Sequence, residues 1–508
     1  MDKILVLDFG GQYNQLIARR VRDNRVYAEI LPYTTDIEVI KEKKYKGIIF
    51  TGGPNSVYDM TSPHYDKSIL SLGIPVLGIC YGCQLIAWME GGKVSTAPVS
   101  EYGKIELTAK SSPLFENVPE KSIVWMSHTD YISQMSDEYK SIASTADCPY
   151  AAMENKKKGI YAVQFHPEVT HTEYGNQVLY NFLYNICECK GDWEMDSFIE
   201  KTITKLRETI KDRNVILGLS GGVDSSVAAA LLSRAVGKQL TCIFVDQGLM
   251  RKNEGDFVEN AFKNTFEMNF IRLNCQDEFL AKLKGVSDPE EKRKIIGSEF
   301  FEAFWNEIRK QNETAFFAQG TIYPDCIESG KGDAATIKTH HNRVRTPDDV
   351  KFLGIIEPLA ELFKDEVRKV GEKLGLPESL VWRQPFPGPG LGVRVIGEIT
   401  KERVSLLQEA DAILCDEMNR NGYENKMSQF FCVLPGVKTV GVMGDHRTYD
   451  DLVIIRAVTT DDFMTADWAK IPYDILAKVS NRITNECKGI NRVAYDITSK
   501  PPATVEWE

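Results

Sequence analysis

Residues 74–92 read IPVLGICYGCQLIAWMEGG. A short apolar run ends at Cys80, and the residues after it place apolar side chains at the spacing of one helix face. Gly78 and Gly82 flank the cysteine, so the segment predicts a β-strand, a sharp turn at Cys80 and an α-helix. A cysteine at such an elbow is a candidate nucleophile, because the helix N-terminus favours its thiolate. The alternative is a buried core thiol.

Outward from this segment, the chain contains two series of short apolar runs separated by helix-like segments. KILVLDF, GIIFTGG and GIYAVQF belong to the first series, and NVILGLSGG begins the second after a polar stretch at 192–213. Three prolines and three glycines at 383–395 then interrupt the periodicity, and β-rich segments follow. We therefore expect an α/β protein with about three domains in its 508 residues.

The composition limits the class of partner. Apolar residues make up 43% of the chain, charged residues 26%, and the formal net charge is -11. A nucleic-acid partner is not expected, because phosphate contacts need clustered lysine and arginine. The sequence has no 18-residue apolar run and no basic leader, which predicts a cytoplasmic protein without a membrane partner. The eleven cysteines lack zinc-site spacing and are expected to be reduced.

A histidine and a glutamate follow another apolar run of the first series. In Gln164-Phe165-His166-Pro167-Glu168, the proline favours an extended backbone at His166. Side chains two residues apart on an extended chain project to the same side. Glu168 can therefore orient the imidazole, and the imidazole can take a thiol proton. The alternative is a surface loop with unrelated charges.

Together, GICYGCQ, FHPE and the segment GGPNS at 52–56 resemble the class I, or triad, glutamine amidotransferases over residues 1–188. The resemblance implies that Cys80 attacks the side-chain amide of glutamine. It further implies that His166 shuttles protons and that Glu168 holds His166.

The same resemblance implies a substrate pocket around the nucleophile. The backbone N–H groups of Gly53 and Tyr81 are expected to form the oxyanion hole, and Gln84 is expected to help hold glutamine. Three further histidines of this half lie outside these motifs and are expected to be structural or substrate-side residues: His64, His128 and His171.

The second series opens on a phosphate-binding pattern. LGLSGGVDSS at 217–226 lies between the strand candidate NVILGL and the helix candidate VAAALLSRAVG. Glycine N–H groups, serine hydroxyls and a helix N-terminus together can cradle a phosphate. The segment is no Walker A loop, because GxxxxGK[ST] is absent. The alternative is an ordinary strand-to-helix turn capped by Asp224 or Ser225.

SGGVDSS resembles the pyrophosphate loop of the N-type ATP pyrophosphatases, which cleave ATP between the α and β phosphates. Asp246 is expected at the end of the next strand, where ligands of open α/β sheets gather. The predicted ATP-binding residues are Ser220, Gly221, Gly222, Val223, Asp224, Ser225, Ser226, Asp246, Lys338 and Lys364. The carboxylates expected to hold Mg²⁺ are Asp224, Asp325 and Glu328. For the last two and Lys338, a solvated loop is the alternative.

The order of these motifs narrows the resemblance. A triad amidotransferase, SGGVDSS, GPGLGVRV and a terminal KPPATVEWE in one chain resemble the GMP synthetases along nearly all its length. The family implies an amidotransferase α/β domain at 1–190, a doubly wound parallel-sheet ATP pyrophosphatase domain at 191–383 and an α+β dimerisation domain at 384–508. It also implies a homodimer and XMP contacts at Arg293, Gln429, Arg492, Lys500 and Glu506.

The residues themselves indicate amide hydrolysis coupled to adenylylation. The family implies a ligase that uses glutamine, Mg²⁺-ATP and XMP, adenylylates the C2 oxygen of XMP, and releases GMP, AMP and pyrophosphate. The alternative is a tRNA-thiolating enzyme with the same loop, in which a cysteine such as Cys326 carries sulfur. The acidic balance and the complete Cys80, His166 and Glu168 set disfavour it. A binding module without activity would lack one of these residues.

Overall fold

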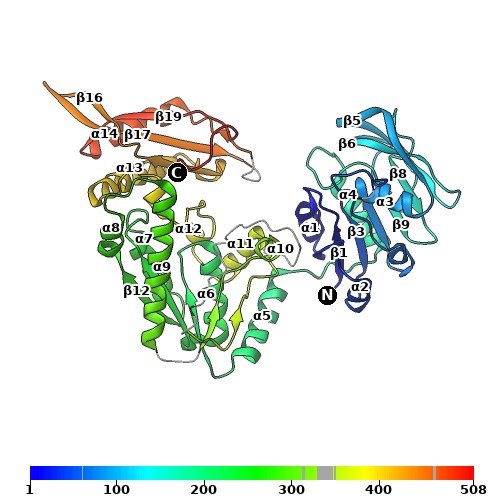
Figure 1. Cartoon of the computed structure of the whole chain (residues 1–508), viewed down its shortest axis with the longest axis horizontal. Coiled ribbons are helices and arrows are strands. Elements are labelled where there is room, and N and C mark those ends of the chain that lie inside the picture. The colour runs from blue at the N-terminus through cyan, green and yellow to red at the C-terminus, as the bar shows by residue number, and fades with distance from the viewer. Residues whose placement is uncertain (60, 312–314, 329–346, 348–349, 461–464) are drawn as a thin grey trace. The chain divides into compact units, whose positions relative to one another are not determined.

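The computed structural model in Figure 1 describes the chain except for residues 60, 312–314, 329–346, 348–349 and 461–464. It forms two compact units, one built on Met1–Phe198 and the other on Ile199–Cys326 with most of the remaining chain. Among the described residues, no helix is both long enough and apolar enough to cross a membrane.

The first unit is organised by a mixed sheet whose described strands follow the order β2-β1-β3-β4-β9-β8-β7-β5-β6. The parallel part consists of β1 (Lys3–Asp8), β2 (Tyr27–Pro32), β3 (Gly47–Phe50), β4 (Val76–Ile79) and β9 (Ile160–Val163). The antiparallel part consists of β8 (Ala152–Asn155), β7 (Lys140–Ser144), β5 (Lys93–Ala109) and β6 (Lys121–Gln134). The helices are α1 (Asn14–Asp23), α2 (Ile37–Glu42), α3 (Tyr81–Met89) and α4 (Gly175–Asn181).

The two parts of this sheet differ in burial as their sequences require. Strands β3, β4 and β9 are apolar throughout and buried throughout, as expected for parallel strands covered on both faces. Burial alternates along much of β6, because one face packs on the core and the other meets solvent. The expected strand, turn and helix around Cys80 are β4 and α3.

The second unit begins within α5 (Met195–Ile210) and contains a parallel sheet of order β12-β11-β10-β13-β14. The strands are β10 (Asn214–Gly218), β11 (Leu240–Asp246), β12 (Asn269–Asn274), β13 (Ala315–Ala318) and β14 (Ile355–Ile356). The helices are α6 (Val223–Val236), α7 (Glu254–Lys263), α8 (Gln276–Leu283), α9 (Pro289–Gln311), α10 (Tyr323–Glu328), α11 (Lys364–Lys373) and α12 (Glu378–Val381). The chain leaves β10 toward β11 and returns to its other side at β13, which confirms the doubly wound arrangement.

The C-terminal part of this unit is α+β, as expected. Strand β17 (His446–Thr459) pairs with β15 (Gln429–Val433), β16 (Lys438–Met443), β18 (Asp467–Trp468) and β19 (Ile490–Asp496). Two long helices accompany them, α13 (Lys401–Arg420) and α14 (Tyr473–Glu486). One cluster of buried apolar side chains includes Phe304 of α9 and Ile455 of β17, so the central and C-terminal sheets share a core.

Candidate functional site

The turn between β4 and α3 holds Cys80 in a strained conformation. Its φ is 52° and its ψ is -105°, an arrangement that costs a non-glycine residue about 1–3 kcal/mol. The flanking glycines are required by close packing: a Cβ on Gly78 would lie 2.6 Å from the carbonyl oxygen of Gly82, and one on Gly82 would lie 2.5 Å from that of Phe50. This is the geometry expected of a nucleophile elbow.

His166 and Glu168 lie beside Cys80 in the buried interior of the first unit. Nδ1 of His166 and Oε1 of Glu168 are 2.7 Å apart. A Cβ on Gly52 would lie 3.6 Å from Cε1 of His166 and 3.9 Å from Cβ of Cys80, which places both side chains around one point. Burial alone would lower the pKa of His166, but the Glu168 carboxylate and the Cys80 thiol raise it, and the net direction is upward. The structure therefore brings the three predicted residues together.

Other polar groups surround the thiol. Sγ of Cys80 donates to the carbonyl oxygen of Ser127 at 3.8 Å, and Nε2 of Gln164 donates to Sγ at the same distance. Gln84 is buried and donates to the carbonyl oxygen of Asp130 at 2.8 Å and to Oε1 of Gln164 at 3.2 Å. Gln84 is thus near the nucleophile, but its amide nitrogen is engaged by the protein.

The two residues predicted for the oxyanion hole are neighbours. A Cβ on Gly53 would lie 3.0 Å from Cγ of Tyr81. Tyr81 is the first residue of α3, and its hydroxyl donates to the carbonyl oxygen of Pro63 at 2.6 Å. The segment that carries Gly53 therefore packs on the start of the helix that follows the nucleophile.

The three remaining histidines of this unit have different surroundings. His64 bonds the carbonyl oxygen of Val57 through Nε2, and its ring packs on Trp88 at 4.7 Å. His171 is exposed and packs on Trp125 at 4.7 Å. His128 is buried, and its Nε2 lies 3.0 Å from Oε2 of Glu101.

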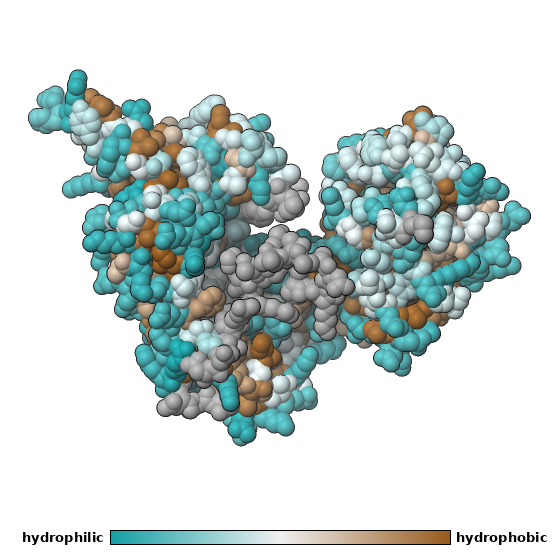
Figure 2. Space-filling view, viewed as in Figure 1, coloured by the Kyte–Doolittle hydropathy of each residue, from teal (hydrophilic) through white to brown (hydrophobic). Residues whose placement is uncertain are grey.

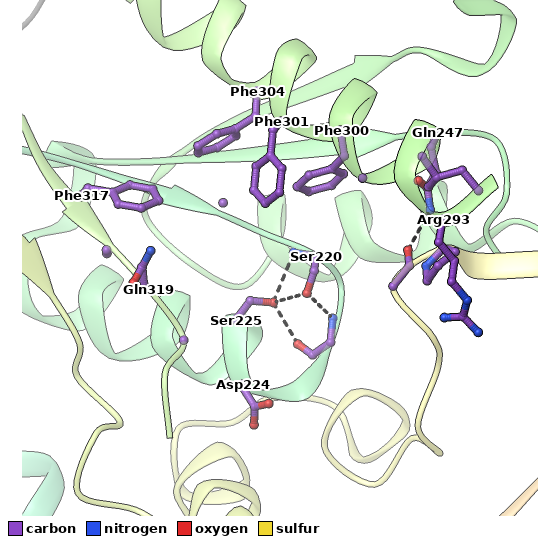
Figure 3. Close-up of a pocket in the computed structure, with 18 residues that line it drawn as sticks. Ser220, Asp224, Ser225, Gln247, Arg293, Phe300, Phe301, Phe304, Phe317 and Gln319 are labelled. Atoms are coloured by element: carbon purple, nitrogen blue, oxygen red, sulfur yellow. Dashed lines mark hydrogen bonds between the residues drawn. The ribbon is translucent and has the colours of Figure 1, made fainter. Parts of the chain in front are cut away.

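In the second unit, the SGGVDSS segment forms the turn before α6 and the first turn of that helix, shown in Figure 3. Oγ of Ser225 accepts from the backbone N–H of Ser220 at 3.3 Å, lies 3.1 Å from Oγ of Ser220, and donates to the carbonyl oxygen of Gly222 at 3.1 Å. Gly222 is the N-cap of α6 and supplies no capping side chain. Neither Asp224 nor Ser225 therefore caps this helix, as an ordinary strand-to-helix turn would require.

The loop opens into a cavity of about 410 Å³. Figure 3 shows aromatic rings of α9 along one side and the phosphate loop along the other. The apolar lining includes Phe300, Phe301, Phe304 and Phe317, and the polar lining includes Ser220, Asp224, Ser225, Gln247, Arg293 and Gln319. Gln247 and Gln319 each keep one buried amide atom without a hydrogen-bond partner in the described part of the chain. The cavity thus combines an aromatic wall, two buried amide atoms without a hydrogen-bond partner among the described residues and a phosphate-type loop.

Three of the predicted ATP and metal residues meet at this loop. Nζ of Lys364, at the start of α11, lies 2.7 Å and 2.9 Å from the two carboxylate oxygens of Asp224. Burial raises the pKa of Asp224, Lys364 opposes this, and Asp325 adds to it, so the second carboxylate is also near. Oδ2 of Asp325 accepts from the backbone N–H of Ile322 at 3.0 Å.

The other residues predicted to bind ATP or metal either have partners elsewhere, lie inside α6 or its turn, or fall outside the described residues. Asp246 ends β11, but Arg272 of β12 donates to its Oδ2 at 2.6 Å and 3.1 Å, and Asp246 does not line the cavity. Val223 and Ser226 are buried within the first turn of α6, and Gly221 precedes its N-cap. Glu328 ends α10 with a side chain outside the described residues, and Lys338 lies outside them altogether.

The C-terminal tail brings together part of the predicted nucleotide set. Nε2 of Gln429 donates to Oε1 of Glu506 at 2.9 Å. Arg394, which is fully buried, donates to the same carboxylate at 2.8 Å and 3.0 Å and packs on the ring of Phe431 at 3.9 Å. Arg293 lines the cavity and donates to the backbone oxygen of Glu508.

The remaining two residues of that set have other contacts. Arg492 is exposed and donates to the carbonyl oxygen of Val440 at 3.3 Å, and the backbone of Lys500 pairs with that of Ala466.

Lys292 was missed by sequence reasoning: it is fully buried, and its Nζ donates to the Glu508 carboxylate at 2.5 Å. In the sequence it belongs to the run EKRK, whose charge gives no sign of burial.

Three family models match parts of the chain. The one described as glutamine amidotransferase class-I matches residues 5–186, the one described as NAD synthase matches 194–295, and the one described as GMP synthase C terminal domain matches 416–507. The first covers the unit that contains Cys80, and the second covers the phosphate loop.

Known proteins also match the whole chain. The chain is 60% identical to "GMP synthase [glutamine-hydrolyzing]" of Ruminiclostridium cellulolyticum over 508 residues, covering 100% of this chain and 99% of that protein. Proteins of the same name from Clostridium botulinum and Acetivibrio thermocellus are also 60% identical, with 99% of each chain covered. Identity at this level over the full length establishes the family: the chain belongs to the glutamine-hydrolysing GMP synthases.

Proposed function

We propose that this chain hydrolyses glutamine at the Cys80 site and uses the ammonia to convert XMP to GMP at the phosphate-loop cavity. The observation that supports the proposal is the presence in one chain of a buried Cys80, His166 and Glu168 set and of a serine-lined phosphate loop at a large cavity. The enzyme is an ATP-dependent carbon–nitrogen ligase with glutamine amidotransferase activity.

At the first site, Cys80 is the nucleophile. Its sulfur attacks the amide carbon of glutamine, His166 passes a proton to the departing ammonia, and water then releases glutamate from the thioester. Glu168 holds the imidazole through the 2.7 Å hydrogen bond to Nδ1, which leaves Nε2 for the proton transfers. The N–H groups of Gly53 and Tyr81 stabilise the oxyanion, and Gln84 supports the pocket.

At the second site, the loop from Ser220 to Ser226 holds ATP phosphates, with Lys364 and Lys338 as cationic partners and Asp246 at the neighbouring strand end. The carboxylates of Asp224 and Asp325 lie near each other beside this loop, which fits a hard cation that prefers oxygen ligands. Mg²⁺ therefore accompanies ATP as part of the substrate, with Glu328 as a further ligand, and offsets the phosphate charge.

XMP binds where Arg293 faces the cavity and where Gln429 and Glu506 meet, with Arg492 and Lys500 as further contacts. Its C2 oxygen takes the adenylyl group from ATP with release of pyrophosphate, and ammonia then displaces AMP to give GMP.

Three domains at 1–190, 191–383 and 384–508 divide these tasks, and the enzyme is a cytoplasmic homodimer. Exposed Val440, Val442 and Tyr449 on the hairpin of β16 and β17 support a subunit contact, and Figure 2 shows hydrophobic residues along this projection.

The test of this function is product analysis with defined substrates. With glutamine, ATP, Mg²⁺ and XMP, we expect glutamate, AMP, pyrophosphate and GMP in equal amounts, and no GMP when XMP is omitted. Formation of thiolated tRNA from a sulfur donor and ATP, with no GMP from XMP, would instead support the tRNA-thiolating alternative and its Cys326.

Replacing Cys80 and Cys83 one at a time with serine should have unequal effects on glutamine-dependent activity. Cys83→Ser is expected to keep most of the glutamine-dependent activity, whereas Cys80→Ser loses it. Cys83 is fully buried inside α3, where burial raises the pKa of its thiol, so it supplies no thiolate. A buried serine hydroxyl costs about 1–3 kcal/mol of stability. The Cys83→Ser variant should therefore unfold at a lower temperature than the parent but keep its activity with glutamine. Steady-state rates with glutamine and thermal melting curves measure both effects, and equal loss of activity would indicate a paired-cysteine role.

A further inference from the structure

A second buried Glu–His pair lies in the first unit, apart from His166 and Glu168. Glu101 of β5 and His128 of β6 face each other in the antiparallel register, with Nε2 of His128 3.0 Å from Oε2 of Glu101. They are 4% and 5% exposed. Nδ1 of His128 has no hydrogen-bond partner in the part of the chain that the structure describes, so Glu101 is the ring's polar anchor.

Glu101 also ties the pair to a third segment. Its Oε1 accepts from the hydroxyl of Thr145 at 2.6 Å, and Oγ1 of Thr145 in turn accepts from the backbone N–H of Cys148 at 2.9 Å. Both carboxylate oxygens of Glu101 are therefore used, and β5, β6 and the turn after β7 are joined at one buried point.

Cys148 completes a cluster of metal-ligand type with this pair. Its sulfur and the ligand atoms of Glu101 and His128 lie within 4.8 Å of one another. Burial raises the pKa of the Cys148 thiol to about 12, which disfavours the thiolate that a transition metal needs. Because both oxygens of Glu101 and Nε2 of His128 already have partners, the geometry favours a hydrogen-bonded anchor over a metal site.

The strand that carries His128 also contacts the amidotransferase site through its backbone. The carbonyl oxygen of Trp125 accepts from the backbone N–H of His166 at 3.0 Å. The carbonyl oxygen of Ser127 accepts from the thiol of Cys80, and that of Asp130 accepts from Gln84. Three residues within the stretch 125–130 of β6 therefore hydrogen-bond through their carbonyl oxygens to the nucleophile, the base and a pocket residue.

His128 holds this segment from its inner side. Burial alternates along β6, and the side chains of Met126, His128 and Asp130 are the buried ones while Ser127 and Thr129 are exposed. The Asp130 carboxylate accepts hydrogen bonds from Ser56 and from the hydroxyl of Tyr58, so it fixes the other end of the segment to the loop that carries Gly53. Ser127 lies between these two anchors, beside Cys80.

We propose that Glu101 and His128 are positioning residues for glutamine hydrolysis: their buried hydrogen bond holds residues 127–130 of β6 where Cys80 and the substrate require them. The inference rests on the proposed glutamine hydrolysis and assigns no chemical step to either residue. Among the described residues, neither side chain hydrogen-bonds to Cys80, His166 or Glu168.

Two variants of the pair form the test. His128→Leu leaves a buried carboxylate without its ring partner and can fail to fold, so Glu101→Leu/His128→Leu, which removes both partners, accompanies it. We expect the double variant to lower kcat/KM for glutamine by on the order of 10²-fold, the scale of a 1 Å misplacement, with KM for glutamine raised. GMP synthesis from ammonium salt uses the other compact unit and should be retained, while the thermal melting curve of the full chain reports on the folding of the first unit.

Two matched variants sharpen the result. His128→Gln places an amide N–H near the position of Nε2 and should recover kcat/KM to within about tenfold of the parent. Glu106→Gln removes an exposed ion pair with Lys121 from the same two strands and should behave as the parent. Recovery of kcat/KM in the His128→Gln variant would show that the hydrogen bond positions the site, because a purely structural role would require the imidazole ring itself.

The following results would overturn the proposal. Parental kcat/KM for glutamine in the double variant would show that the pair does not position the site. Stoichiometric zinc in the purified full chain, lost in Cys148→Ser, would reassign the cluster as a metal site. A parental enzyme that makes GMP from ammonium but never hydrolyses glutamine would refute the proposed function and this inference together.

Discussion

Cys80→Ala is expected to abolish glutamine-dependent synthesis of GMP while synthesis from ammonium salt continues. The thiol is the only nucleophile proposed for the amide, and removing such a group lowers turnover by roughly 10⁴-fold or more. Alanine keeps the Cβ atom, so the variant bears the same strain at φ 52° and the change isolates the sulfur. The measurement is the GMP rate with glutamine and with ammonium salt, at saturating ATP and XMP.

The ammonium arm makes this experiment decisive, because the phosphate loop belongs to the other compact unit. Loss of both rates in a folded Cys80→Ala protein would contradict two separable sites. A surviving glutamine rate would remove Cys80 from the mechanism and return it to the role of a buried core thiol, the alternative that its sequence leaves open.

The parts of the fold that could be predicted are those specified by neighbouring residues. The strand before Cys80, the helix after it and the turn between them follow from an apolar run, helical spacing and two glycines that close packing requires. His166 and Glu168 are two residues apart on an extended chain, so their hydrogen bond is also a local feature. The serine-rich turn before α6 is also specified by neighbouring residues.

Contacts between distant segments could not be predicted. Lys364 donates a hydrogen bond to Asp224, which lies 140 positions earlier in the chain. Arg272 donates to the Asp246 carboxylate because β12 pairs with β11. A single sequence carries no record of which residues meet, so it gives no sign that Gln164 contacts Cys80 or that Arg394 hydrogen-bonds to Glu506. A buried cation is especially hard to foresee, because a charged residue in a polar run normally faces water.

The shared core of the second unit has the same explanation. The Pro- and Gly-rich segment at 383–395 interrupts local periodicity, which is the usual sign of a boundary. In the structure, Leu391 and Val395 of this segment are buried in the cluster that also contains Leu249 and Val453. A break in secondary structure is therefore no break in packing here, since side chains on both sides pack into one core.

Asp224→Asn is expected to lower pyrophosphate release from ATP and XMP by about 100-fold or more, equivalent to about 2.7 kcal/mol of barrier, while glutamine hydrolysis at Cys80 persists. Asparagine keeps the shape of the side chain and removes its charge. A helix-cap role cannot explain a loss, because Gly222 is the N-cap of α6 and asparagine caps about as well as aspartate. The carboxylate instead stands at the cavity beside Lys364 and near Asp325, where phosphates and their Mg²⁺ are proposed to bind.

Lys364→Met separates the two ways in which Asp224 could act. If the carboxylate serves only to hold the Lys364 ammonium at 2.7 Å, both variants should lose similar activity and neither loss should depend on Mg²⁺ concentration. If Asp224 anchors Mg²⁺, its asparagine variant alone should need more Mg²⁺ for half-maximal pyrophosphate release, because a neutral amide is a weaker ligand for a hard cation than a carboxylate. Burial raises the pKa of Asp224, so the charged form that binds a cation depends on Lys364 nearby, and the methionine variant should show an acid limb of activity moved toward higher pH. Near-parental pyrophosphate release by Asp224→Asn at ordinary Mg²⁺ would exclude the metal role and leave the ion pair with Lys364 as a purely structural contact.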